Sequence, residues 1–336
     1  MILNLIFLFL GLFLFLSVAY FFYIKFDLLD QPKKYGFSRH AVPYSFGLVL
    51  CLLFAIAAMV MNVFTFKLTV LVGACMGLSL MCFVDDFRNL DPVLRLCVQF
   101  CLATLVVHSG VFLLEVSNPF GANLHLGIFS KVVSVFWIVF LTNIMNFLDG
   151  ISGLTSGVST IAFVTLGVLA IDPSIHVIDQ SLLVNLSFVA AFLAFIGFVL
   201  EIPTPNPKVL LGDSGSMFFG FLLASLSMVN GGKLATLGIV LLIPIFDGLF
   251  VIFYRIYKGK SPVNKDTNHL HHKLLEKGVS RLGIVCIYMI LTIIFATLAI
   301  FSWNSFWKFV TLTMVVIFMS VFVYLTWKPN GSQRGN

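Results

Sequence analysis

Charge is scarce in this chain, because only 10% of its 336 residues are Asp, Glu, Lys or Arg while 60% are hydrophobic. Soluble globular domains carry about 25% charged residues, so this composition and a mean hydropathy of +1.07 exclude a soluble fold. The chain also lacks any Cys-x-x-Cys pair, and its six cysteines all fall in or beside apolar stretches. We interpret them as packing residues, and neither as disulfides nor as metal ligands.

Apolar stretches long enough to cross a membrane make up most of the chain. A helix of about 20 residues crosses roughly 30 Å of hydrocarbon. Eleven such stretches occur, at residues 1–24, 43–64, 68–84, 92–115, 129–147, 150–171, 182–200, 214–230, 233–255, 281–302 and 305–327. The first lacks an Ala-x-Ala-like cleavage site, so we interpret it as a retained span. The sequence predicts an all-α polytopic membrane protein with about 11 transmembrane helices, as one polytopic domain over 1–328 and a short cytoplasmic tail over 329–336.

The basic residues are divided unevenly between the two sides of the predicted membrane. Of the 20 Lys and Arg residues, sixteen fall on one side, and the other side holds only Lys67, Lys131, Lys233 and Lys308. Because short cytoplasmic loops collect Lys and Arg, the first side is predicted to be cytoplasmic, with the N-terminus outside and the C-terminus inside. The net charge of +6 then describes a basic cytoplasmic face. Such a face suits membrane lipids with anionic headgroups and phosphorylated substrates, and nothing in it calls for nucleic acid.

Four short polar segments interrupt the apolar chain, at residues 85–91, 143–149, 212–216 and 269–272. The predicted topology places all four on the cytoplasmic side. Ionisable residues so close to hydrocarbon are costly and usually functional. Segments that are far apart in the chain would then converge at one membrane surface, so we interpret them as parts of one active site at the cytoplasmic face.

The first two segments carry carboxylates and amides. Asp85 and Asp86 end the third apolar stretch, where adjacent carboxylates can share Mg²⁺, which binds through one or two carboxylates plus substrate phosphates; a capping role in the loop is the alternative. Asn143, Asn146 and Asp149 recur every three residues, which places them on one arc of a helix. They can hydrogen-bond a nucleobase or ribose, or make a polar contact between helices.

The third segment, residues 212–216, opens an apolar stretch with small residues. Exposed backbone N–H groups at a helix start favour phosphate binding. Asp213 adds a further ligand of the kind that Mg²⁺ prefers, although an ordinary N-cap is the alternative.

The fourth segment places His269, His271 and His272 in the longest cytoplasmic loop. No cysteine or carboxylate completes a tetrahedral zinc set at standard spacing, so we favour contact with a diphosphate or sugar over a metal site or a solvated loop. Arg255 is a further candidate for substrate binding, or it pairs with Asp247 about two helical turns before it.

The order of these motifs resembles that of the polyprenyl-phosphate N-acetylhexosamine-1-phosphate transferases of glycosyltransferase family 4, which are related to the bacterial phospho-MurNAc-pentapeptide translocase. The resemblance covers most of the chain and rests on Asp85-Asp86, Asn143-x-x-Asn146-x-x-Asp149-Gly150-x-x-Gly153-Leu154, Gly212-Asp213-x-Gly215-Ser216, Pro244-x-x-Asp247 and Asp266-x-x-His269-Leu270-His271-His272. The His-x-His-His form is similar to the N-acetylhexosamine branch. Two features depart from the family: Ser152 stands where many relatives carry a second Asp, and the first cytoplasmic loop lacks the usual Gly-Gly pair.

The resemblance implies a Mg²⁺-dependent sugar-1-phosphate transferase, with Mn²⁺ as the alternative metal, in the bacterial inner (plasma) membrane. Undecaprenyl phosphate would attack the β-phosphorus of a UDP-N-acetylhexosamine and UMP would leave, which starts a lipid-linked envelope glycan such as O-antigen. Asp85 and Asp86 would be catalytic, and Asp213 and Asp86 would bind the metal. The substrate-binding residues would be Asn143, Asn146 and Asp149 for the nucleotide, and His269, His271, His272 and Arg255 for the sugar-phosphate.

Two other functions stay open. Multiple spans and the mid-span Asp247 would suit a transporter or flippase, although most polar groups lie at one surface and no internal repeat is visible. A catalytically inactive assembly scaffold is the second alternative, because Ser152 replaces a carboxylate. Asp85, Asp86 and Asp213 argue against it. The sequence also leaves open which sugar is used and whether the protein is a homodimer.

Overall fold

A computed structural model describes residues 2–32, 40–61, 65–171, 180–204, 207–229, 233–259, 269–302 and 304–327. The predicted tail at 329–336 and Asp266 of the histidine motif lie outside the described residues. The structure is 78% helical, which confirms an all-α polytopic membrane protein in outline.

Thirteen helices are described, and each apolar stretch of the sequence overlaps at least one of them. They are α1 (Ile2–Lys25), α2 (Gly47–Val60), α3 (Phe66–Arg88), α4 (Pro92–His108), α5 (Ser130–Leu148), α6 (Leu154–Ala170), α7 (Gln180–Leu200), α8 (Gly212–Val229), α9 (Leu234–Val240), α10 (Leu242–Tyr257), α11 (Leu270–Glu276), α12 (Arg281–Phe301) and α13 (Ser305–Trp327). A short 3-10 helix, Gly127–Phe129, precedes α5. The strands β1 (Glu115–Val116) and β2 (Leu124–His125) pair antiparallel, a small hairpin that the sequence analysis did not predict.

Six helices of the described chain are long and apolar enough to cross a membrane: α3, α5 with its preceding turn, α7, α8, α12 and α13. The α9–α10 pair makes a seventh span if the two helices are counted together. Shorter apolar helices cover Gly11–Lys25, α2, α4 and α6. The total of 11 spans and the orientation of the chain therefore remain predictions.

The ninth apolar stretch is not one straight helix, and a single span over 233–255 stays a prediction. It breaks at Leu241 into α9 and α10, whose axes differ by 81°. Pro244 has no N–H group for the carbonyl of Val240, and its ring would clash with that carbonyl in a continuous helix. Val240 is the last residue of α9, so the break lies where the proline requires it.

Helix α8 occupies the centre of the bundle and packs against α2, α3, α5 and α6. Asp213 and Val229 are its only residues that are not buried. Apolar burial drives little helix association in lipid, so close approach of backbones matters. A Cβ atom at Gly220 would lie 2.8 Å from the Leu141 carbonyl oxygen of α5, and one at Gly47 of α2 would collide with the backbone of Gly215.

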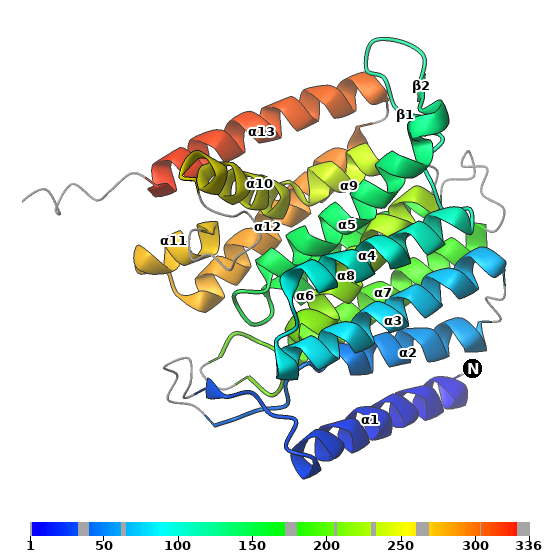
Figure 1. Cartoon of the computed structure of the whole chain (residues 1–336), viewed down its shortest axis with the longest axis vertical. Coiled ribbons are helices and arrows are strands. Elements are labelled where there is room, and N and C mark those ends of the chain that lie inside the picture. The colour runs from blue at the N-terminus through cyan, green and yellow to red at the C-terminus, as the bar shows by residue number, and fades with distance from the viewer. Residues whose placement is uncertain are drawn as a thin grey trace, which may run out of the picture.

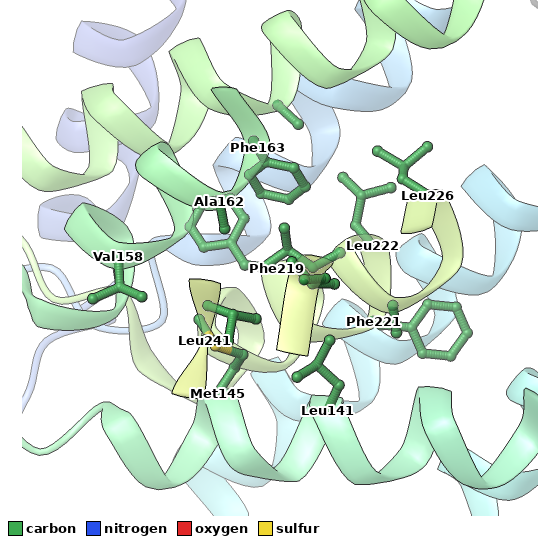
Figure 2. Packing of buried hydrophobic residues seen from close by; sticks show 14 of the residues in the cluster. Leu141, Met145, Val158, Ala162, Phe163, Phe219, Phe221, Leu222, Leu226 and Leu241 are labelled. Atoms are coloured by element: carbon green, nitrogen blue, oxygen red, sulfur yellow. The ribbon is translucent and has the colours of Figure 1, made fainter. Parts of the chain in front are cut away.

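The bundle has two distinct ends. Figure 1 shows the β1–β2 hairpin at one end and α11 at the other. Between them, apolar side chains from α5, α6, α8 and the α9–α10 junction interlock, including Met145, Phe163, Phe219 and Leu241 (Figure 2). This packing fixes the positions from which the polar segments project at the α11 end.

Candidate active site

A pocket of about 390 Å³ lies where the end of α3, the α5–α6 turn, the α7–α8 connection and the start of α12 meet. Its lining includes three of the predicted site residues, Asp86, Asp149 and Asp213. Three of the four predicted polar segments thus contribute to one pocket, whereas the histidine segment at 269–272 does not line it.

Asp85 and Asp86 point in different directions, because adjacent residues of a helix are separated by about 100°. The buried Asp85 accepts hydrogen bonds from the Leu90 N–H at 2.6 Å and from Arg95 Nη1 at 2.6 Å. Asp86 faces the pocket, and its Oδ1 accepts from the Asp213 N–H at 3.2 Å. Its Oδ2 is buried without a hydrogen-bond partner among the described residues. The two carboxylates therefore do not form a shared pair.

Arg95, which the sequence analysis counted only as a cytoplasmic basic residue, joins three helices. Its Nη1 lies 2.6 Å from Asp85 Oδ2 of α3 and 3.2 Å from Asp213 Oδ2 of α8. Arg95 lies in the first turns of α4. Its guanidinium therefore connects the end of α3 at Asp85 with the start of α8 at Asp213. An arginine inside an apolar stretch was the signal that could have identified it.

The start of α8 brings Asp213 to the pocket. Gly212 has a φ of 70°, a left-handed conformation that glycine adopts without a Cβ clash, and a Cβ there would lie 2.5 Å from Asp86 Oδ2. Ser214 and Ser216 are buried, and Ser216 accepts a hydrogen bond from Asn146 Nδ2 at 3.1 Å. The hydroxyl groups of this motif thus join helices.

The amides of Asn143 and Asn146 make contacts between helices, which was the alternative reading of their spacing. Asn143 Nδ2 donates to Gln99 Oε1 of α4 at 2.6 Å, and Asn146 donates to Ser216 of α8. Only Asp149 of the three reaches the pocket lining, together with Ser152 of the following turn. Burial raises the pKa of Asp149 well above its ordinary value, and the charges of Glu201 and Asp213 raise it further.

Glu201, which follows α7, is a pocket residue that the sequence analysis did not identify. It is 1% exposed and accepts hydrogen bonds from the Leu211 N–H at 2.6 Å and the Ser156 hydroxyl at 3.1 Å. Burial raises the pKa of Glu201 to about 7, and the bonds from Leu211, Ser156 and the Gly153 N–H partly offset that rise. A carboxylate at the end of an apolar stretch, like Asp85 and Asp86, was the signal available in the sequence.

The three histidines lie beside the pocket and outside its lining. His269 Nδ1 is 3.0 Å from Asp247 Oδ2, and the Leu270 N–H donates to Asp247 Oδ1 at 2.7 Å, so Asp247 holds the start of α11. His271 is buried directly against Gly150 of the Asp149 turn, and neither ring nitrogen has a hydrogen-bond partner among the described residues. Burial lowers the pKa of His271 well below its ordinary value, as do the neighbouring His272 and His269.

Arg255 and His272 complete the set of predicted residues. Arg255 is buried near the end of α10 and does not line the pocket. The ring centroid of His272 lies 4.3 Å from that of His271, and burial lowers the pKa of His272. Neither of these two side chains lines the pocket.

The lining of the pocket is rich in carboxyl groups. Its described lining contains five carboxylates, from Asp30, Asp86, Asp149, Glu201 and Asp213, and one cationic side chain, Arg281. Within the described ranges, no three His, Cys, Asp or Glu side chains are grouped as a ready-made metal site. Asp86 and Asp213 both line the pocket with carboxylate groups, and Asp86 Oδ2 has no hydrogen-bond partner among the described residues.

Comparisons with known proteins fit this arrangement. Residues 68–231 match the model of glycosyl transferase family 4. The chain is 28% identical over 314 residues, 90% of its own length and 86% of the other, to a probable undecaprenyl-phosphate N-acetylglucosaminyl 1-phosphate transferase of Bacillus subtilis.

Two further relatives carry similar names. An undecaprenyl-phosphate alpha-N-acetylglucosaminyl 1-phosphate transferase of Yersinia pestis is 28% identical over 289 residues, 82% of this chain and 77% of that protein. A decaprenyl-phosphate N-acetylglucosaminephosphotransferase of Mycolicibacterium smegmatis is 28% identical over 244 residues, 65% of this chain and 58% of that protein. Together with the ordered motifs, the match over residues 68–231 shows that this part of the chain is similar to glycosyl transferase family 4.

Proposed function

We propose that this protein transfers N-acetylglucosamine 1-phosphate from UDP-N-acetylglucosamine to undecaprenyl phosphate in the bacterial plasma membrane, as the first step of a lipid-linked envelope glycan. The observation that carries this proposal is the convergence of Asp86, Asp149 and Asp213 on one pocket in a chain whose relatives bear that activity in their names. An oxygen of the lipid phosphate attacks the β-phosphorus of the donor. The bond from that phosphorus to the bridging oxygen breaks, and UMP leaves with the electron pair.

A divalent cation is part of the proposal because the pocket would otherwise repel its substrates. Five carboxyl groups line the pocket around a donor diphosphate and an acceptor phosphate that are themselves anionic, and burial makes it costly for Asp149 and Glu201 to stay charged there. Asp86 Oδ2, buried and without a partner among the described residues, and Asp213 fit a Mg²⁺ ion that takes its remaining ligands from phosphates and water. Bound there, Mg²⁺ would neutralise the negative charge of the diphosphate; Mn²⁺ has the same ligand preference.

The side chains of the protein position the reacting groups. Arg95 holds the Asp213 carboxylate at 3.2 Å and is held in turn by Asp85, so we assign Asp85 a positioning role. The acceptor phosphate is already substantially ionised near neutral pH, so the attack needs no strong base. The Asp149 turn, with the histidine segment packed behind Gly150, would bind the nucleotide and sugar.

Release of UMP tests this function. Purified protein with undecaprenyl phosphate and Mg²⁺ is expected to release UMP from UDP-N-acetylglucosamine or another UDP-N-acetylhexosamine, and not from UDP-glucose. A panel of UDP-sugars would also identify the sugar. Absence of UMP release from every donor would contradict the proposal and favour a transporter or an inactive scaffold.

A further inference from the structure

Glu201 joins two walls of the pocket through one buried carboxylate. Its Oε1 accepts from the Leu211 N–H at 2.6 Å and its Oε2 from the Ser156 hydroxyl at 3.1 Å. These donors belong to two regions that are far apart in the chain, the α5–α6 turn with the start of α6, and the segment before α8. The side chain is 1% exposed, so water does not compete for these bonds.

Each region joined by Glu201 carries one of the pocket's carboxylates. Gly153 closes the turn that begins at Asp149, and its φ of 80° gives that turn a fixed shape. Leu211 is two residues before Asp213, which lies in the first turn of α8. Hydrogen bonds to one side chain thus connect the region of the Asp149 turn to the segment that leads into Asp213.

Burial of a carboxylate is costly unless donors satisfy it. The end of α7 does not require one, because the Glu201 N–H already bonds to the Gly197 carbonyl at 2.9 Å and the Lys208 N–H to the Leu200 carbonyl at 3.1 Å. The backbone therefore closes this helix end without the side chain. The Glu201 carboxylate instead accepts hydrogen bonds from the two segments of the pocket.

We propose that Glu201 is a positioning residue, which sets the distance between the nucleotide-binding turn at Asp149 and the phosphate-binding start of α8 at Asp213. The inference rests on the proposed function and names a residue that acts through others. Misplacement of reacting groups by about 1 Å can lower a rate about 10²-fold. Loss of this connection should therefore lower kcat far more than it raises KM.

The experiment compares purified full-length Glu201→Ala, Glu201→Gln and Ser156→Ala with the unaltered protein. The control is Ser159→Ala, which removes another buried hydroxyl of α6 that has no hydrogen-bond partner among the described residues. Measured quantities are kcat, the KM for UDP-N-acetylglucosamine and the melting temperature in detergent.

Glu201→Ala is expected to lower kcat about 10²-fold with a change in KM below about threefold. Glu201→Gln keeps one oxygen that can accept from Leu211, so it should recover part of that loss. Ser156→Ala should lower kcat several-fold, and Ser159→Ala should leave it unchanged.

The inference is overturned if folded Glu201→Ala turns over as fast as the unaltered protein, or if activity falls only in proportion to the folded fraction. Should Glu201→Ala fail to fold, equal kcat values for Ser156→Ala and Ser159→Ala would overturn it. An inactive unaltered protein would instead refute the proposed function. The two failures are therefore distinguishable.

Discussion

The side chains around the pocket are of two kinds. Some line the pocket, and others hold the lining residues in position. Asp86 and Asp213 line the pocket, whereas Asp85 and Arg95 form an ion pair at 2.6 Å that supports Asp213 from outside. Two neighbouring aspartates thus have different surroundings, and their substitutions should have different consequences.

Asp213→Ala is expected to lower kcat/KM about 10²-fold to 10³-fold and to raise the Mg²⁺ concentration needed for half-maximal rate, because a carboxylate oxygen next to the metal is lost. A Mg²⁺ titration of UMP release measures both effects. Asp91→Asn is the matched control, since Asp91 caps α4 through the N–H groups of Val93 and Leu94 and asparagine caps a helix equally well. Unchanged Mg²⁺ dependence in Asp213→Ala would refute the metal assignment.

His271 should make the stability of the fold depend on pH. Its folded-state pKa is lowered by burial and by His272 and His269, so the unfolded chain binds a proton below about pH 6.5 that the folded chain excludes. Stability from this group is present above that pH and is lost on acidification. The melting temperature of the unaltered protein should fall more between pH 7.5 and 5.5 than that of His271→Gln.

The control for this measurement is His125→Gln on the exposed β1–β2 hairpin. Its side chain is 77% exposed, so its substitution should leave the pH dependence as in the unaltered protein. An equal fall of the melting temperature in His271→Gln and in the unaltered protein would show that His271 does not carry the effect.

Sequence reasoning at this scale found the acidic residues more readily than their partners. The carboxylates of Asp86, Asp149 and Asp213 stand out in an apolar chain, and all three reach the pocket. Spacing alone could not show that Asn143 and Asn146 bond to neighbouring helices, because that depends on which helices pack against α5. Ser152, which departs from the family motif, lines the same pocket.

At the scale of elements, α8 organises the site because its small residues let other helices approach. The segment Gly212–Ser216 was predicted as a phosphate-binding helix start, and the structure adds that its first turn is pressed against α2 and α3. Helix positions were predictable from apolar length. The bend between α9 and α10 was not, although Pro244 marks it, because length alone cannot separate one span from two short helices.

Gly47→Ala tests the contact between α2 and α8. A Cβ at Gly47 would collide with the backbone of Gly215, so the two helices must move apart, at about 1–3 kcal/mol for an overpacked site. A lower melting temperature and lower activity are expected together. Gly73→Ala in α3, where a Cβ meets nothing within 4 Å, is the control and should leave both unchanged. Equal effects of the two substitutions would contradict the central position of α8.

On the scale of the whole molecule, the polar segments gather at the end of the bundle opposite the β1–β2 hairpin (Figure 1). Composition alone predicted a polytopic membrane protein, because so little charge is present. Composition could not predict the total of 11 spans, since several described helices are shorter than a bilayer crossing requires. The inside position of the pocket still rests on the uneven distribution of Lys and Arg.

The proposed reaction transfers the β-phosphorus of the donor to the lipid together with the sugar. An isotope label at that phosphorus tests this directly. UDP-N-acetylglucosamine labelled with ³²P at the β-phosphate, incubated with purified protein, Mg²⁺ and undecaprenyl phosphate, should give labelled lipid and unlabelled UMP. Label released as UDP, with an unlabelled lipid product, or no labelled lipid under any condition, would contradict transfer of a sugar 1-phosphate.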